Sequence, residues 1–395
     1  MFKLLPSEQM LVVDPYFSPY AGGANLLVVD DYLISWRESL NPLKYSDVVS
    51  RTLEQFFLWS PVGVLTATTQ HEVFGHGYRL RSLGVTPISY RITGRGGSTY
   101  FSVPWNFEVG KLISVAVAGL EAESILAWEL KMKWIKKRKI DGRESTLYIT
   151  TQQSLFTYTM RTYLSPFILS GPPGGNDIHH YLLLHRALFP NQELSLSTLS
   201  KWAALSLLDP MTYYSWYAYF SFMIKDKPSG VPMISLAKDL DYLPNLKVGF
   251  APYAPEVYFE NFFLNKDHPI YFYLKGGRRS YGFGGVYDEL LAGSYGHLGI
   301  KIDLWNQGNF ISSLTLEDLE HERYRPFGTL PETPRQRKFG GALSLRAFMR
   351  FGEDKALFVE VGGKTSGYLP GYSLGKGPVF RIGLKFGLSP IQKEE

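Results

Sequence analysis

The sequence of 395 residues predicts an α+β fold, in which a helical region is followed by an antiparallel β region. The hydrophobic pattern changes near residue 230. Before that point, apolar residues come in blocks long enough for helices, at 51–85, 108–138, 146–168, 178–189 and 199–224. After it, apolar and polar residues alternate with the period of two that is typical of strands. We therefore expect an N-terminal segment at 1–50, a helical domain at 51–230 and a β domain at 231–395.

Two loops interrupt the helical region. The stretch TPISYRITGRGGSTYFSVPW (86–105) is predicted to form a pair of strands. In the stretch SGPPGGND (170–177), proline and glycine end one helix, and Asp177 is placed to cap the next one. The helical domain is thus expected to contain one small strand pair among its helices.

The alternation in the β region is clearest in three stretches, HLGIKIDLW (297–305), LSLRAFMRF (343–351) and VFRIGLKFG (379–387). In each stretch, one face is apolar and the other carries mostly small or charged residues. Roughly eight antiparallel strands of this kind form either a β-barrel in an outer membrane, with the apolar face toward lipid, or a sheet that buries its apolar face against the helices. Strands of about nine residues with Tyr and Trp at their ends favour the barrel.

Composition limits the classes of function. The chain has no cysteine, so disulfide scaffolds are excluded and any metal must be held by His, Asp or Glu. The net charge is only +5, the basic residues are scattered, and the sequence contains no nucleic-acid-binding module. Aromatic residues make up 15% of the chain, which favours surfaces at a membrane boundary. We expect a membrane protein of the bacterial cell envelope, with the outer membrane favoured and no nucleic-acid partner.

The stretch TTQHEVFGHGYRLRS (68–82) is the main candidate for chemistry. Two histidines four residues apart on a helix, with Glu after the first, form the H-E-x-x-H zinc signature. Here His76 follows His71 by five residues, which corresponds to about 140° on a regular helix instead of about 40°. One widened π-type turn absorbs the extra residue, and Gly75 is where that turn meets the least steric resistance. The spacing therefore predicts a distorted helix that brings both imidazoles to one metal ion.

Glu72, beside the first histidine, is placed to act as the general base toward a metal-activated water. A catalytic zinc takes three protein ligands, so a third must come from elsewhere. In AVAGLEAESILAWEL (116–130), Glu121 and Glu123 interrupt an otherwise apolar helix. They lie about 200° apart on that helix, so one ion cannot bind both. We favour Glu123, with Glu121 as the alternate, and expect the unused glutamate to form a salt bridge.

Asp177 is the other candidate for the third ligand. The stretch GGNDIHHYLLLH (174–185) places it at the start of a helix that also carries His179, His180 and His185. If Asp177 does not bind a metal, its expected role is to cap that helix. The residues alone leave both roles open.

The six residues HEVFGH (71–76) resemble the H-E-x-x-G-H signature of the dipeptidyl peptidase III family of zinc peptidases. In that family both histidines bind zinc, the glutamate is the base, and a downstream glutamate completes the site. The resemblance implies that Glu121 or Glu123 is the third ligand. It covers these short motifs and no other part of the chain.

The order of motifs over residues 55–185 also resembles that of site-2-type membrane metallopeptidases. Their ligand helix continues to a Leu-Gly, as in RLRSLG (79–84), and is followed by a Gly-rich strand pair and an Ala-Gly helix, as in AVAGL (116–120). Their third ligand is a later Asp, which implies Asp177 here. Two features depart from that family: the inserted residue in the signature, and the context Asn-Asp-Ile in place of Leu-Asp-Gly. The β region has no counterpart in it.

These patterns predict a zinc-dependent peptidase of the bacterial envelope that acts on a peptide or protein substrate. His71 and His76 bind Zn²⁺ together with Glu123 or Asp177, and Glu72 deprotonates the attacking water. The strand pair at 88–103 is placed to hold the substrate as an added strand. One alternative is a β-barrel outer-membrane protein whose helical half is a plug or structural domain without hydrolytic activity. Another is hydrolysis of a lipid or other non-peptide bond, because the motif does not determine which bond is broken.

Overall fold

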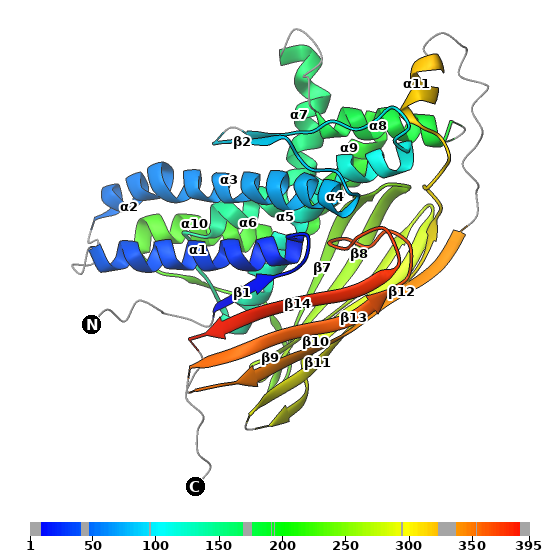
Figure 1. The fold of residues 1–395 in the computed structure, drawn as a ribbon. Coiled ribbons are helices and arrows are strands. Elements are labelled where there is room, and N and C mark those ends of the chain that lie inside the picture. Colours follow the sequence, from blue (N-terminus) through cyan, green and yellow to red (C-terminus); the bar gives the residue numbers. More distant parts are fainter. Residues whose placement is uncertain are drawn as a thin grey trace.

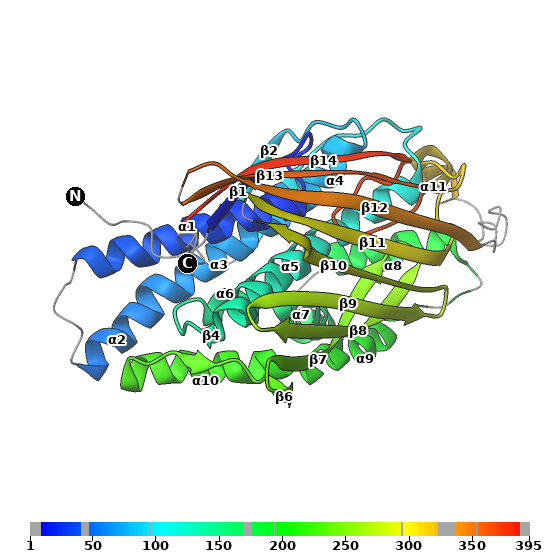
Figure 2. The same ribbon diagram turned by 90° about the horizontal axis from the view of Figure 1, so that it is seen from below.

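The computed structural model describes residues 9–40, 47–94, 96–168, 176–190, 192, 194–293, 295–322, 337–352 and 354–387. It confirms the α+β class: helices dominate the N-terminal part of the chain, and a large antiparallel sheet forms the C-terminal part. Figure 1 shows the helices on one side of a strongly curved sheet. Figure 2 shows that the sheet curves around one long helix, α5 (Val109–Lys137), so the helices lie on its concave side.

The helical part contains the helices expected from the apolar blocks, together with two π-helical turns and with α1 (Pro19–Leu40), which lies in the N-terminal segment where no helix was predicted. In chain order its helices are α1, α2 (Val48–Glu54), η1 (Gln55–Trp59), α3 (Ser60–Thr69), η2 (Gln70–His76), α4 (Gly77–Ser82), α5, α6 (Ser145–Gln152), α7 (Ser154–Ile168), α8 (Asp177–Leu188), α9 (Leu196–Ala204), η3 (Leu205–Leu208) and α10 (Pro210–Lys225). The expected strand pair is confirmed as β2 (Ser89–Thr93) and β3 (Gly96–Tyr100). A short pair, β4 (Lys139–Ile140) and β5 (Ser229–Gly230), joins the end of α5 to the end of α10.

The large sheet has ten strands. They are β1 (Gln9–Val13), β6 (Ile234–Ala237), β7 (Leu240–Ala251), β8 (Ala254–Asn265), β9 (His268–Gly277), β10 (Ser280–Gly293), β11 (Gly296–Gly308), β12 (Arg337–Arg350), β13 (Lys355–Lys364) and β14 (Gly377–Phe386), with α11 (Leu316–Glu322) between β11 and β12. The hydrogen-bonded order runs β1-β14-β13-β12-β11-β10-β9-β8-β7-β6.

The expectation of a roughly eight-stranded closed barrel is wrong for the described residues. No pairing joins β1 to β6 there, so the sheet is open, with these two strands as its edges. At one edge, helix α1 covers β1: the Asn25 side chain accepts a hydrogen bond from Val12 N and donates one to Val12 O, both at 2.8 Å. The Asn25 amide therefore takes the place of a strand partner for Val12, whose backbone groups would otherwise be unpaired at this edge.

The concave face of the sheet carries buried charged side chains together with aromatic and apolar ones, whereas the convex face is apolar and exposed. On β14, Arg381 is only 5% exposed, whereas its neighbours Phe380 and Ile382 are 47% and 41% exposed. The other strands repeat this pattern. The sheet that was expected as the alternative to a barrel, with its apolar face buried against the helices, is therefore also wrong in its orientation. The reason is that α5 presents charged groups to the concave face, among them Lys131, which lies 3.9 Å from Glu260.

The helices and the sheet share their hydrophobic cores. One core joins apolar residues of α5 and α8 to Val248 and Phe250 of β7. Another joins the second half of α5 to Tyr258 and Phe262 of β8. The N-terminal segment also takes part, because it supplies β1 to the sheet. The three segments expected from the sequence thus pack on one another. Among the described residues, none of the helices combines the length and apolar character needed to cross a bilayer.

Candidate metal centre

The two histidines of the motif lie on a π-helical turn. Gln70–His76 forms η2, a wide turn between the regular helices α3 and α4. This confirms the distortion that the five-residue spacing predicted, because the extra residue is absorbed by i→i+5 hydrogen bonding. Gly75 allows the turn to lie against α5: a Cβ at this position would be 2.7 Å from the carbonyl oxygen of Ala118.

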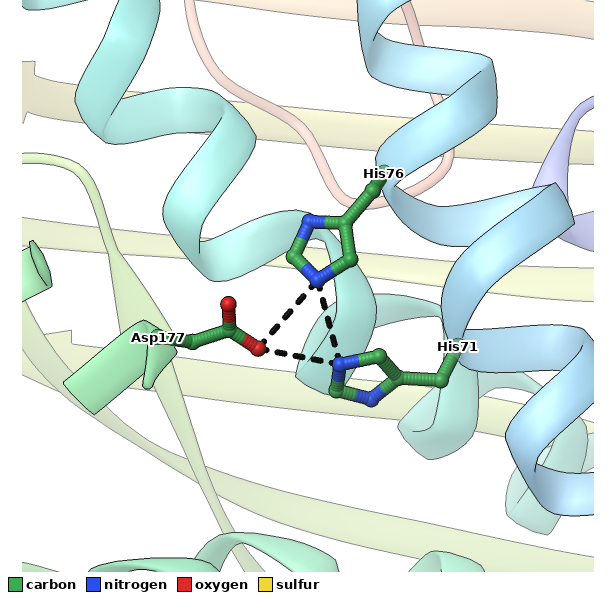
Figure 3. A group of neighbouring side chains, drawn as sticks. All are labelled: His71, His76 and Asp177. Atoms are coloured by element: carbon green, nitrogen blue, oxygen red, sulfur yellow. Dashed lines mark hydrogen bonds and ion pairs between the residues drawn. The ribbon is translucent and has the colours of Figure 1, made fainter. Parts of the chain in front are cut away.

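The turn directs both imidazoles toward one carboxylate. His71 Nε2 and His76 Nε2 are 3.1 Å apart, and they lie 3.0 Å and 3.2 Å from the same oxygen, Oδ2 of Asp177 (Figure 3). In a tetrahedral zinc site with bonds of about 2.0 to 2.1 Å, neighbouring ligand atoms are separated by about 3.3 to 3.4 Å. The three donor atoms are therefore within a few tenths of an ångström of the spacing that one bound ion requires.

Asp177 reaches this position because it is not the cap of its helix. The expected capping role belongs to Asn176, whose side-chain oxygen accepts a hydrogen bond from His179 N at 3.1 Å. Asp177 is the first residue of α8, and its backbone N donates to the Tyr158 hydroxyl at 3.1 Å. Its carboxylate is left to face the two histidines. Thr162 holds the Asn176 amide, accepting from Nδ2 at 2.9 Å.

The other ring nitrogen of each histidine has a partner that determines where the ring hydrogen lies. His76 Nδ1 is 2.8 Å from the carbonyl oxygen of Val115, which only accepts, so Nδ1 carries the hydrogen. His71 Nδ1 is 3.1 Å from Glu123 Oε2, and the negative charge of that carboxylate favours the hydrogen on Nδ1. In the neutral tautomers the Nε2 atoms therefore present lone pairs. Two nitrogen lone pairs and a carboxylate oxygen then face one point, an arrangement that a cation satisfies.

The structure separates the roles of the two glutamates on α5. Glu123 contacts the far side of the His71 ring, where it orients that ligand and is not one of the three converging donors. Glu121 points away from the site: it forms a buried ion pair with Arg79 Nη2 at 3.0 Å and accepts from the Tyr368 hydroxyl at 2.7 Å. The expectation that the unused glutamate forms a salt bridge is confirmed for Glu121.

Glu72 is buried beside the centre and is held by the strand pair. Its Oε2 accepts a hydrogen bond of 2.7 Å from the Thr99 hydroxyl on β3. The backbone of β3 lies so close that a Cβ at Gly97 would be 2.5 Å from Glu72 Cγ. The side chain thus has one fixed orientation between η2 and β3.

The electrostatics favour positive charge at this point. Burial lowers the pKa of His71, but the carboxylates of Glu123 and Asp177 outweigh it and hold that pKa well above its usual value. Burial likewise lowers the pKa of His76, while Asp177 raises it by more. Burial raises the pKa of Asp177, but the two histidines lower it overall. Without a metal, protons supply the positive charge that this group of side chains stabilises.

Sequence reasoning missed several residues that build the centre. Gly119 is one: a Cβ there would lie 2.2 Å from His71 Nε2, so only glycine leaves room for the ring. Thr99 and Tyr158 are polar neighbours of Glu72 and Asp177 with no motif around them. The AVAGL stretch was a usable signal for Gly119, because small residues mark close helix contacts. Nothing local to Thr99 or Tyr158 indicates their role.

Comparison of the chain with protein-family models, curated proteins and solved structures gives no match. Any functional assignment for this centre therefore depends on its geometry and chemistry.

Proposed function

We propose that this protein is a metal-dependent hydrolase, with zinc the metal that fits best, and that it cleaves peptide bonds. His71, His76 and Asp177 would hold the ion. The observation that carries the proposal is the convergence of two histidine Nε2 atoms and one carboxylate oxygen on a single point. The ring hydrogen of each histidine is placed on Nδ1, on the opposite side of the ring. Nitrogen and oxygen donors in a three-ligand set are typical of catalytic zinc, which keeps a fourth position for water.

The ion would supply a water molecule whose pKa is lowered to about 7 and would polarise the bond to be cleaved. Glu72 would take the proton from that water and pass it to the leaving amine. Thr99 keeps the Glu72 carboxylate in one rotamer, so the base is oriented before substrate binds. Glu123 and the Val115 carbonyl orient the two imidazoles, which keeps both Nε2 atoms directed at the ion.

The strand pair supports a peptide as the substrate. Among the described residues, β3 pairs with β2 along one edge and with no strand along its other edge. A substrate peptide added to the open edge would receive main-chain hydrogen bonds and would lie next to Glu72, which β3 contacts. This mode of binding selects an extended peptide and does not suit a lipid ester.

The substitution Glu72→Gln tests this function. Glutamine keeps an oxygen for the Thr99 hydrogen bond and has the same size, so the fold and the bound metal should be retained. We expect hydrolysis of a peptide library by the zinc-loaded protein to fall by about a hundredfold to ten-thousandfold, because the general base is lost. Metal content is measured on the same sample.

The control is Glu108→Gln, which removes a half-exposed carboxylate that pairs with Lys111 at the start of α5. Its activity should equal that of the unaltered protein. Unchanged turnover in the metal-loaded Glu72→Gln protein would overturn the mechanism. Stoichiometric metal without any peptide hydrolysis in the unaltered protein would favour a structural ion, as expected for the non-hydrolytic alternative.

A further inference from the structure

The convex face of the ten-stranded sheet carries an unusual amount of exposed apolar surface. Its exposed side chains, each between 36% and 73% exposed, include Leu11, Val13, Phe259, Phe272, Leu274, Tyr281, Phe283, Ile302, Phe339, Leu343, Leu345, Met349, Val361, Phe380, Ile382 and Leu384. Soluble monomers rarely leave so large a contiguous apolar patch in water. The charged side chains of the same strands point the other way, into the molecule.

These side chains form continuous rows across the sheet. The pairing register places Leu11, Leu384, Leu357 and Met349 side by side on four adjacent strands, from β1 to β12. A second row joins Phe380, Val361, Leu345 and Ile300, from β14 to β11. The apolar surface is therefore a property of the whole sheet and not of isolated exposed residues.

The apolar face has the length of a bilayer. Along β12 it extends from Phe339 to Phe351, a run of about 40 Å at about 3.3 Å per residue. A strand tilted by about 45° needs only about 9 to 11 residues to cross the hydrocarbon layer of about 30 Å. Exposed aromatic side chains stand at both ends of the face, with Tyr281 and Phe339 at one end and Tyr295 and Phe351 at the other. Aromatic rings favour the two interfaces of a membrane.

The two ends of the sheet differ in charge. At the end near α8, the exposed basic residues are Arg278, Arg337, Lys338 and Lys376. The strand ends and turns at 251–254, 277–280, 337–338 and 364–377 contain no Asp or Glu, whereas helix α11, in the connection from β11 to β12 at this end, exposes Glu317, Asp318 and Glu320. The opposite end is mixed and exposes Asp239, Asp267 and Asp354 beside lysines. The basic end is complementary to anionic lipid headgroups, which lie immediately beside an acyl-chain layer.

The shape of the face decides between lipid and a second copy of the chain. The sheet curves around α5, so its free face is convex (Figures 1 and 2). Two convex faces touch only along a line and leave most of the apolar surface in water. Acyl chains conform to a convex surface and cover all of it.

The apolar surface continues onto α10, the last helix of the helical part. Residues 210–224 in α10 contain no charged residue, and six of their large side chains are exposed: Tyr213, Tyr214, Trp216, Tyr217, Phe220 and Ile224. Figure 2 shows α10 next to β6 and β7, at the edge of the sheet opposite to β1. An apolar layer that covers the sheet would also reach this helix.

We propose that the convex face of the sheet is embedded in the acyl-chain layer of a lipid bilayer, with the end that carries Arg278 and Lys338 at anionic headgroups. The metal centre and the helices other than α10 then lie on the side of the sheet that faces away from lipid. The proposal does not depend on the hydrolytic function, because it uses none of the residues of that site.

Site-directed labelling tests the acyl-chain contact. The chain has no cysteine, so Leu345→Cys provides a single thiol at the middle of the convex face, where the side chain is 51% exposed. The full chain is labelled with bimane and reconstituted into vesicles of phosphatidylcholine and phosphatidylglycerol. We expect strong quenching by lipids that carry a nitroxide midway along the acyl chain. The matched control is Leu183→Cys on α8, an equally accessible leucine, 61% exposed, which should not be quenched.

Three results would overturn the proposal. The first is a failure of the folded protein to bind the vesicles, and the second is the absence of quenching at position 345 in protein that is bound. The third is strong spin–spin coupling between nitroxides attached at this position in different molecules, which would assign the face to a second copy. A circular dichroism spectrum like that of the unaltered protein confirms that the variant is folded.

The contact with anionic headgroups is tested by charge reversal at the basic end of the sheet. Arg278→Glu and Lys338→Glu each change the charge by two, so each should weaken binding to phosphatidylglycerol vesicles by about twentyfold to thirtyfold and leave binding to pure phosphatidylcholine unchanged. Lys355→Glu, at the mixed end of the sheet, is the matched control and should have a smaller effect. Equal effects at both ends would contradict the assigned orientation.

Discussion

Helix α5 carries two buried glutamates that are two residues apart and have opposite surroundings. Glu121 is paired with Arg79 and also accepts hydrogen bonds from the Tyr368 hydroxyl and from Gly371 N, so its charge is balanced. Glu123 faces His71, and beyond that ring three donor atoms converge without a cationic side chain among the described residues. Both carboxylates are 7% exposed.

The comparison shows that burial of charge does not by itself indicate a functional site. A buried carboxylate with a guanidinium partner has its charge compensated within the protein, so its removal lowers the free energy of unfolding. A buried group of metal-ligand atoms without a cationic side chain needs a bound cation or protons to compensate its charge. Substitutions there change the affinity for the cation. The two clusters can therefore be told apart by which property a substitution changes.

The largest effect is expected at the paired glutamate. Glu121→Leu should lower the free energy of unfolding by about 3 to 5 kcal/mol, because Arg79 is then buried without its counter-charge. Chemical denaturation measures the loss. Zinc affinity of the folded fraction should not change. The double variant Arg79→Met, Glu121→Leu should regain part of the stability, because it leaves no unpaired charge in the interior. A loss below about 1 kcal/mol in Glu121→Leu alone would show that Arg79 is not left as an uncompensated buried charge.

A histidine without an acidic partner sharpens the comparison. Burial lowers the pKa of His185 from 6.5 to about 4, and its Nε2 lies 3.3 Å from the Tyr253 carbonyl oxygen. The unfolded chain therefore binds more protons than the folded protein between these values. The stability that neutral His185 contributes is complete above pH 6.5 and is lost as the pH falls toward 4, by about 3 kcal/mol in all.

The measurement is the difference in unfolding free energy between the unaltered protein and His185→Phe as a function of pH. Subtraction cancels the groups that both proteins share, including His71 and His76, whose raised pKa values give a dependence of the opposite sign. We expect the difference to change through the window from pH 6.5 to about 4 in favour of the phenylalanine variant. A difference that does not vary with pH would place His185 in a solvated environment.

The smallest effect is expected at the unpaired glutamate. Glu123→Ala should weaken zinc binding by about tenfold to a hundredfold, because His71 loses the group that orients its ring and keeps the hydrogen on Nδ1. Competition against a chelator measures the affinity. Denaturation of the metal-free protein should show a much smaller loss than for Glu121→Leu. Unchanged zinc affinity would separate Glu123 from the centre and remove the contrast between the two glutamates.

Much of the fold could be predicted from the sequence because it depends on local periodicity. The helical blocks before residue 230, the strand pair at 86–105 and most of the antiparallel strands after residue 230 are present. The alternating run at 311–317 was also expected to be a strand, but it leads into helix α11. So is the wide turn, which follows from two histidines that must share a face despite a five-residue separation. The number of strands was underestimated because three strands were missed. β1 comes from the opposite end of the chain, a long-range pairing that leaves no local pattern, and β6 and β7 lie before the first run that was expected to be a strand.

The sequence by itself determined the helix and strand content, the faces of each element, and the pair of histidines on one widened turn, because all of these depend on neighbours a few residues apart. Only the tertiary structure decided which carboxylate joins the histidines. The sequence favoured Glu123 over Glu121 and left Asp177 as the other candidate. The packing of α8 and α5 around η2 instead brings Asp177 to both histidines. The tertiary structure also decided which face of the sheet is buried, because the alternation of residues defines two faces, and the charged groups of α5 select the polar one.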